Sequence, residues 1–97
     1  MLIVAGTGYV DPERRGALLE SLAPVLRHVR TTPGCLDYVV AADPIEPDRV
    51  NIYERWESEA HLTTHLAGIA QSAPAVPDVR SVEVVRYEIS GSRPLHG

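Results

Sequence analysis

The stretch from Arg49 to His65 constrains the fold more than any other part of the chain, because it predicts a strand that leads directly into a helix. Side chains alternate across a strand, so the two faces of this strand can be separated from the sequence. One face carries Val50, Ile52, Glu54 and Trp56. The opposite face carries Asn51, Tyr53 and Arg55. Polar and aromatic residues therefore occupy positions where a purely structural strand would carry aliphatic ones.

The helix that follows is predicted to place a histidine on its apolar side. Ser58 is a favourable N-cap residue, and Glu59 suits the positive end of the helix dipole. The spacing i, i+3, i+4, i+7 then puts four residues on one stripe: Leu62, His65, Leu66 and Ile69. The combination predicts a small pocket lined by aromatic side chains and containing one titratable group, His65.

The remaining elements follow from residue patterns and turn signals. Strands are predicted at Leu2–Tyr9, Cys35–Ala42, Arg49–Trp56 and Arg80–Ile89. Asp11, Pro12 and Glu13 predict a helix start, and Pro33-Gly34 predicts that this helix has ended. Pro24 inside the helix is expected to kink or break it. The second helix is expected from Glu59 to Ala67 or slightly beyond Gly68, and the loop 71–78 suits a pocket lid.

The order of these elements predicts an α+β fold. The sequence β-α-β-β-α-β is typical of the ferredoxin-like arrangement, a four-stranded antiparallel sheet with two helices on one face. Residues 1–90 are expected to form a single domain, and residues 91–97 a flexible C-terminal tail.

Apolar residues on both faces of the predicted strands indicate a partner subunit. In the last strand, Val82 and Val84 oppose Val85, Tyr87 and Ile89. An antiparallel sheet covered on one side should alternate apolar and polar residues, and two helices can cover only one face. We therefore expect a homodimer in which sheet packs against sheet.

Composition excludes several functional classes. The chain has no lysine, which excludes Schiff-base chemistry and a P-loop lysine. Its net charge of −4 and scattered arginines argue against binding nucleic acid or a membrane surface. The single cysteine, Cys35, cannot form an internal disulfide. No apolar run approaches the roughly 20 residues of a membrane span, so a soluble, cytoplasmic protein is expected.

With this order of elements, the chain resembles the antibiotic biosynthesis monooxygenase family of dimeric α+β barrels. The resemblance covers about Met1 to Ile89 and is carried by three segments. These segments are Pro33–Tyr38 (PGCLDY), Asn51–Ala60 (NIYERWESEA) and His65-Leu66.

The resemblance implies a monooxygenase that uses dioxygen as co-substrate and needs no flavin, metal or nicotinamide. Such enzymes oxidise hydroquinones, anthrones or related phenols in a dry aromatic slot. By this resemblance His65 is the candidate base, with Asn51 and Tyr53 as hydrogen-bond donors. The candidate substrate-binding residues are Trp56, Tyr38, Leu62 and Leu66.

The residues present disfavour haem degradation and metal binding, while two other functions remain open. Haem degradation in this superfamily uses an Asn on strand one, a Trp in the second helix and a later His. This chain instead has Gly6-Thr7-Gly8, His65, and no histidine in residues 66–95. His61 and His65 have a metal-binding spacing but no visible third ligand. Other open functions are a non-catalytic dimeric binding module and an isomerase or cyclase. A structural ion pair between Glu54 and Arg86 is also expected.

Overall fold

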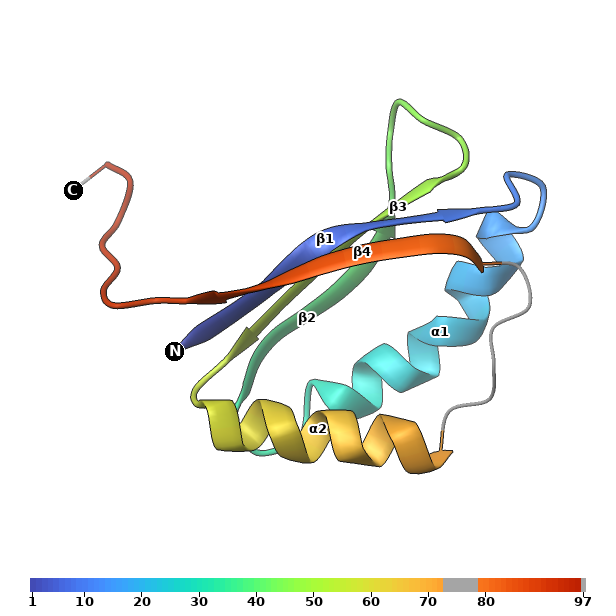
Figure 1. Cartoon of the computed structure of the whole chain (residues 1–97). Helices are drawn as coiled ribbons and strands as arrows, with labels where there is room; N and C mark the ends of the chain where they lie inside the picture. Colours follow the sequence, from blue (N-terminus) through green and yellow to red (C-terminus); the bar gives the residue numbers. More distant parts are fainter. Residues whose placement is uncertain (73–78, 97) are drawn as a thin grey trace.

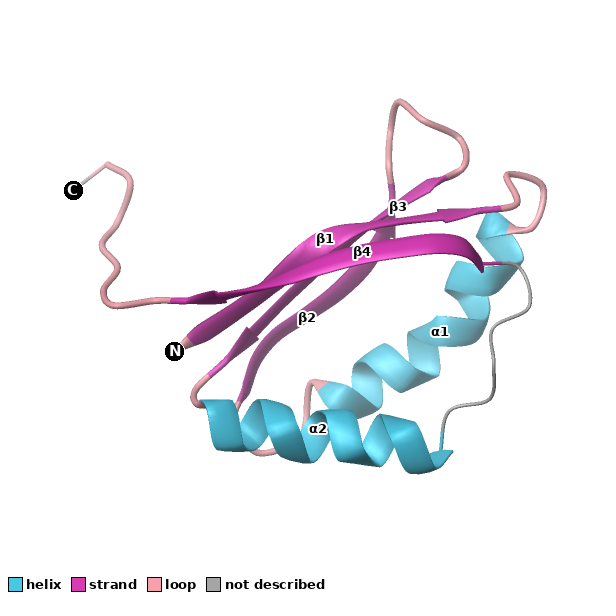
Figure 2. Ribbon diagram, in the orientation of Figure 1, coloured by secondary structure: helices cyan, strands magenta, loops and turns pink. Residues whose placement is uncertain are grey.

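The computed structural model describes residues 1–72 and 79–96 and has the predicted order of elements (Figures 1 and 2). These are β1 (Leu2–Val10), α1 (Arg15–Val29), β2 (Cys35–Ala42), β3 (Arg49–Trp56), α2 (Glu59–Ser72) and β4 (Val79–Glu88). The ferredoxin-like βαββαβ fold is confirmed. No helix in the described ranges is long and apolar enough to cross a membrane.

The four strands form one antiparallel sheet in the order β2-β3-β1-β4. Both helices lie on the same side of this sheet (Figure 2). We call that side the inner face; β3 contributes Val50, Ile52, Glu54 and Trp56 to it. The outer face carries Asn51, Tyr53 and Arg55 from β3, together with Val85 and Tyr87 from β4. The alternation predicted for β3 is therefore the one that the fold uses.

Helix α1 begins later than the sequence predicts. Asp11 forms a turn instead, in which its carboxylate accepts the N–H of Glu13 at 2.9 Å and its carbonyl accepts the N–H of Arg14 at 3.0 Å. The helix starts at Arg15, whose guanidinium donates to three backbone carbonyls of the β2–β3 hairpin, those of Asp43, Glu46 and Arg49. This contact ties the first helical residue to the hairpin. The helix continues through Pro24 to Val29 without a break.

Helix α2 is longer than predicted and reaches Ser72. Its extension takes up the first two residues of the expected lid loop, and residues 73–78 of that loop lie outside the described residues. Beyond β4, residues 89–96 form neither helix nor strand. The mobility of this tail stays a prediction.

The main cluster of buried side chains is small and lies at one end of the sheet. Leu2, Val29, Trp56 and Leu62 form one cluster that joins β1, α1, β3 and α2. Helix α1 packs against β2, and helix α2 against β3. Strand β4 is correspondingly exposed on both faces, which leaves its apolar side chains open in the single subunit.

Gly6 lies where the backbone of β4 leaves no room for a side chain on β1, and its replacement tests the packing of the sheet. A Cβ atom at this position would overlap the Glu83 carbonyl and approach the Val84 Cα at 2.7 Å. Because both obstacles are backbone, we expect Gly6→Ala to lower the free energy of unfolding by about 1–3 kcal/mol. Urea denaturation followed by circular dichroism measures this loss.

Gly16 supplies a matched control for that substitution. It lies in α1 with no heavy atom within 4 Å of an added Cβ. Alanine is a better helix former than glycine, so Gly16→Ala should raise stability by up to about 1 kcal/mol. Equal stability of the Gly6→Ala and wild-type proteins would contradict the close approach of β1 to β4.

Candidate active site between the two helices

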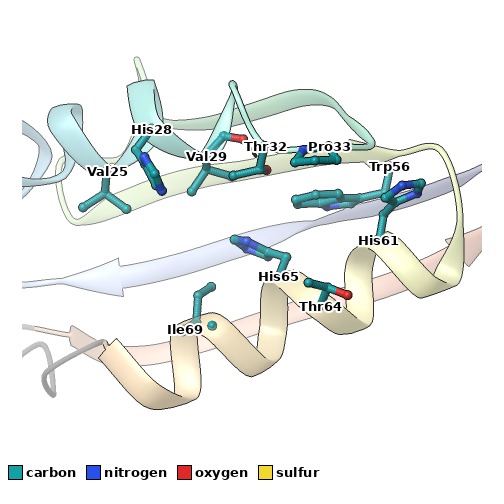
Figure 3. A pocket seen from close by; sticks show the side chains of 11 residues that line it. Val25, His28, Val29, Thr32, Pro33, Trp56, His61, Thr64, His65 and Ile69 are labelled. Carbon is teal, nitrogen blue, oxygen red and sulfur yellow. Dashed lines mark hydrogen bonds between the residues drawn. The ribbon is translucent and has the colours of Figure 1, made fainter.

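A cavity of about 550 Å³ lies between α1, α2 and the end of β3 (Figure 3). Its volume is in the range of about 300–1,000 Å³ that small-molecule sites occupy. Its wall combines aliphatic, aromatic and imidazole side chains with two threonines. The lining residues are Val25, His28, Val29, Thr32, Pro33, Trp56, His61, Thr64, His65, Gly68 and Ile69.

His65 turns inward from α2 into this cavity, as the sequence predicts. Its ring lies 4.7 Å from the Trp56 ring and 5.2 Å from the Tyr38 ring, measured between centroids. Burial lowers the pKa of His65 below its usual 6.5, because desolvation disfavours the charged imidazolium. Its Nε2 is buried and has no hydrogen-bond partner among the described residues. A buried nitrogen of this kind usually binds a water or a ligand.

Trp56 forms the floor of the site and has no exposed surface. Its indole N–H donates to Glu54 Oε1 at 3.0 Å, which orients the ring across the inner face. Burial raises the pKa of Glu54, and the bond from the indole opposes that rise. The expected pair between Glu54 and Arg86 is wrong, because Arg86 reaches α2 and pairs with Glu59 at 3.3 Å.

Tyr38 supports the site from behind. It contacts both His65 and Trp56 edge-on, and it is not among the residues that line the cavity. Burial raises its pKa to about 12, so the phenol stays neutral across the physiological range. Tyr38 therefore holds the two rings in position and does not itself form part of the cavity wall.

Leu62 and Leu66, predicted as substrate-binding residues, are not among the residues that line this cavity. Leu62 is 1% exposed and belongs to the core beside Trp56. Leu66 is 46% exposed, because one residue of helix rotates a side chain by about 100° from His65. The cavity instead takes Gly68 and Ile69, one turn after His65.

The grouping of Asn51 and Tyr53 with His65 is also wrong. Both belong to the outer face, since they alternate with Glu54 and Trp56 along β3. Asn51 donates to Asp43 Oδ1 at 2.9 Å and accepts from Arg49 Nε at 2.8 Å. Hydrogen bonds from the backbone of Glu46, from Asn51 and from the backbone of Ile45 lower the pKa of Asp43 to about 2. Asn51 therefore stabilises the hairpin and lies outside the cavity.

Two further histidines line the cavity, a position that the sequence did not predict for either of them. His28 precedes the core residue Val29 on α1, and His61 precedes His65 by one turn of α2. A signal for His61 was present, because Ser58 lies three residues before it and can reach its ring. Within residues 1–72 and 79–96, no three His, Cys, Asp or Glu side chains gather closely enough to hold a metal ion.

Comparison with known proteins shows the family and the fold of the chain. The chain matches the family model described as "Antibiotic biosynthesis monooxygenase" over residues 1–86. A solved structure from Deinococcus radiodurans that bears the same family name is 29% identical, with each chain covered fully and a TM-score of 0.87. One from Chloroflexus aurantiacus, also of that name, is 28% identical, with 97% of each chain covered and a TM-score of 0.64. No protein of curated function matches.

The fold is shared more widely than any one activity. A heme-degrader from Mycobacterium tuberculosis, solved with two hemes in its active site, is 16% identical with a TM-score of 0.72. That alignment covers 97% of this chain and 100% of the other. At this identity the likeness concerns the backbone alone, and the residues of the cavity must decide its chemistry.

Proposed function

Because the chain belongs to the antibiotic biosynthesis monooxygenase family, we propose that it oxidises a hydroquinone- or anthrone-like aromatic with dioxygen, without a bound cofactor. The observation that carries this proposal is the position of the His65 imidazole in the cavity wall. This imidazole lines the cavity, has a lowered pKa and lies against Trp56 and Tyr38. A neutral imidazole beside an apolar slot is suited to removing a proton from a bound phenol.

The chemistry asked of these residues is modest. His65 accepts the proton of the substrate hydroxyl, and the resulting electron-rich anion reduces dioxygen. Carbon–oxygen bond formation gives a peroxide, which loses water to leave a carbonyl. The substrate therefore gains one oxygen atom and loses two hydrogens, and dioxygen supplies both the inserted atom and the oxygen of the water. Trp56, Pro33 and Ile69 provide apolar walls for this step.

Incubation with anthrone or a naphthohydroquinone, in air and under argon, tests the proposal. We expect product with one oxygen gained and two hydrogens lost, formed faster than in buffer alone and only in air. Labelled dioxygen should place its isotope in the product. Tight binding without oxygen uptake would favour a binding module, and a product of unchanged mass an isomerase or cyclase. Either result would overturn the proposed oxidation.

We also propose that the protein is a homodimer joined through the outer face of the sheet. Tyr53, Val85 and Tyr87 are 37%, 46% and 51% exposed there in the single subunit. Apolar side chains standing together on an open sheet are typical of surfaces that bind another chain. The helices cannot cover them, because both lie on the inner face (Figure 1).

Sedimentation at micromolar concentration checks the dimer. Val85→Glu combined with Tyr87→Glu should convert it to a monomer, because the two charges would be buried without partners. Val82→Glu is the matched control: Val82 is 55% exposed on the same strand and points to the inner face. A monodisperse wild-type monomer would end this proposal.

A further inference from the structure

His61 lies in the cavity wall where three segments of the chain meet. The N–H of Glu57 donates to the carbonyl of Gly34 at 2.8 Å, which joins the turn before β2 to the start of α2. Gly34 has a φ of 81°, and a Cβ at this position would overlap the His61 ring. A glycine at position 34 therefore both permits the turn and makes room for the imidazole.

Ser58 holds the opposite side of that ring. Its Oγ lies 2.7 Å from His61 Nδ1 and accepts the backbone N–H of His61 at 3.3 Å. The backbone N–H can only donate, so the hydroxyl oxygen acts as its acceptor. The hydroxyl proton is free to point to Nδ1, and which of the two atoms donates depends on the tautomer of the imidazole. A neutral imidazole that accepts at Nδ1 carries its proton on Nε2.

Nε2 is thus the ring nitrogen of His61 that can meet a ligand. It has no hydrogen-bond partner among the described residues, and it is not buried. It is therefore accessible, and the ring belongs to the wall of the cavity beside Trp56 (Figure 3).

We propose that His61 is the hydrogen-bond donor of this cavity and that its Nε2–H binds an oxygen of the aromatic substrate. This role replaces the one that Asn51 and Tyr53 cannot fill from the outer face. The inference rests on the proposed function for the identity of the ligand and narrows it to aromatics that carry a carbonyl or hydroxyl oxygen. As His65 removes a proton, the same donor stabilises the negative charge on that oxygen.

Nitrogen NMR of the free protein tests the tautomer without any turnover. At a pH where the imidazoles are neutral, His61 should show an unprotonated Nδ1 and a protonated Nε2. Ser58→Ala removes the hydroxyl that selects this form, so its spectrum should shift toward a mixture of tautomers. A wild-type His61 protonated on Nδ1 would overturn the proposal, whether or not the protein oxidises anthrone.

A matched pair of inert probes tests the hydrogen bond itself. Fluorenone has one carbonyl acceptor, and fluorene has the same ring skeleton without it. Trp56 is the only tryptophan of the chain and lines the cavity, so quenching of its fluorescence reports binding. His61→Leu should weaken the binding of fluorenone about tenfold, as expected for one lost hydrogen bond. The affinity for fluorene should change by no more than about twofold.

His61→Gln completes the series, because its amide restores a donor of similar reach. It should recover most of the fluorenone affinity, which a purely packing role of His61 would not produce. Equal weakening of both probes by His61→Leu would overturn the proposal, as would failure of wild-type protein to prefer fluorenone. If the protein prefers fluorenone but never consumes oxygen, the proposed oxidation is contradicted. The role of His61 as hydrogen-bond donor is then still supported.

Discussion

Replacing His65 with alanine should reduce kcat for the oxidation of an anthrone or hydroquinone by about 10²–10⁴-fold, the usual contribution of a general base. The imidazole lines the cavity 4.7 Å from the Trp56 ring, and its burial keeps it neutral and able to accept a proton. His65→Gln should lose as much activity, because its amide fills similar space and cannot take the proton. Oxygen consumption under saturating substrate measures the effect.

His96 supplies the control for this substitution. It lies in the exposed segment after β4, so His96→Ala removes an imidazole without touching the cavity. Its activity should match that of the wild type. Oxidation at an undiminished rate by folded His65→Ala protein would exclude His65 as the base.

The same burial predicts the direction of two pH effects. Protonation stops the base, so kcat/KM should fall on the acid side with a midpoint below the usual 6.5. The unfolded chain binds this proton more tightly than the folded one. Stability contributed by neutral His65 is therefore complete above about 6.5 and is lost as the pH falls toward the folded-state pKa. His65→Gln should lose less stability over that interval.

Replacing Trp56 with alanine should lower the free energy of unfolding by about 3–5 kcal/mol. The indole is completely buried and joins β3 to α1 and α2 through contacts with Val29 and Leu62. The indole N–H also donates to Glu54. In the alanine variant the buried carboxyl of Glu54 would lose this partner. The total free energy of unfolding of a small domain is only about 5–15 kcal/mol, so much of the Trp56→Ala protein should unfold on mild heating.

Trp56→Phe separates packing from the hydrogen bond. It keeps most of the buried ring and removes the indole N–H, so it should cost about 1–3 kcal/mol, less than the alanine variant. Far-ultraviolet circular dichroism during urea unfolding measures both, because the fluorescent reporter is itself removed. A loss below about 1 kcal/mol for Trp56→Ala would contradict the central place of this ring.

The outcome for particular residues shows where sequence reasoning succeeds. Alternation in β3 correctly put Trp56 and Asn51 on opposite faces, and the helical spacing turned His65 toward the sheet. The error came from the family resemblance, which gathered Asn51 and Tyr53 around His65 despite that alternation. The start of α1 was missed because the carbonyls that bind Arg15 lie in a hairpin about thirty residues away.

The sequence by itself determined the order of strands and helices and the face on which each β3 side chain lies, because these depend on the geometry of neighbouring residues. Tertiary structure alone decided that His28 of α1 and His61 of α2 share one cavity wall, and that Gly34 makes room for the His61 ring. A cavity forms between elements that are far apart in the sequence, and no repeating pattern of residues links them. Its walls are set by how those elements pack, which no local pattern specifies.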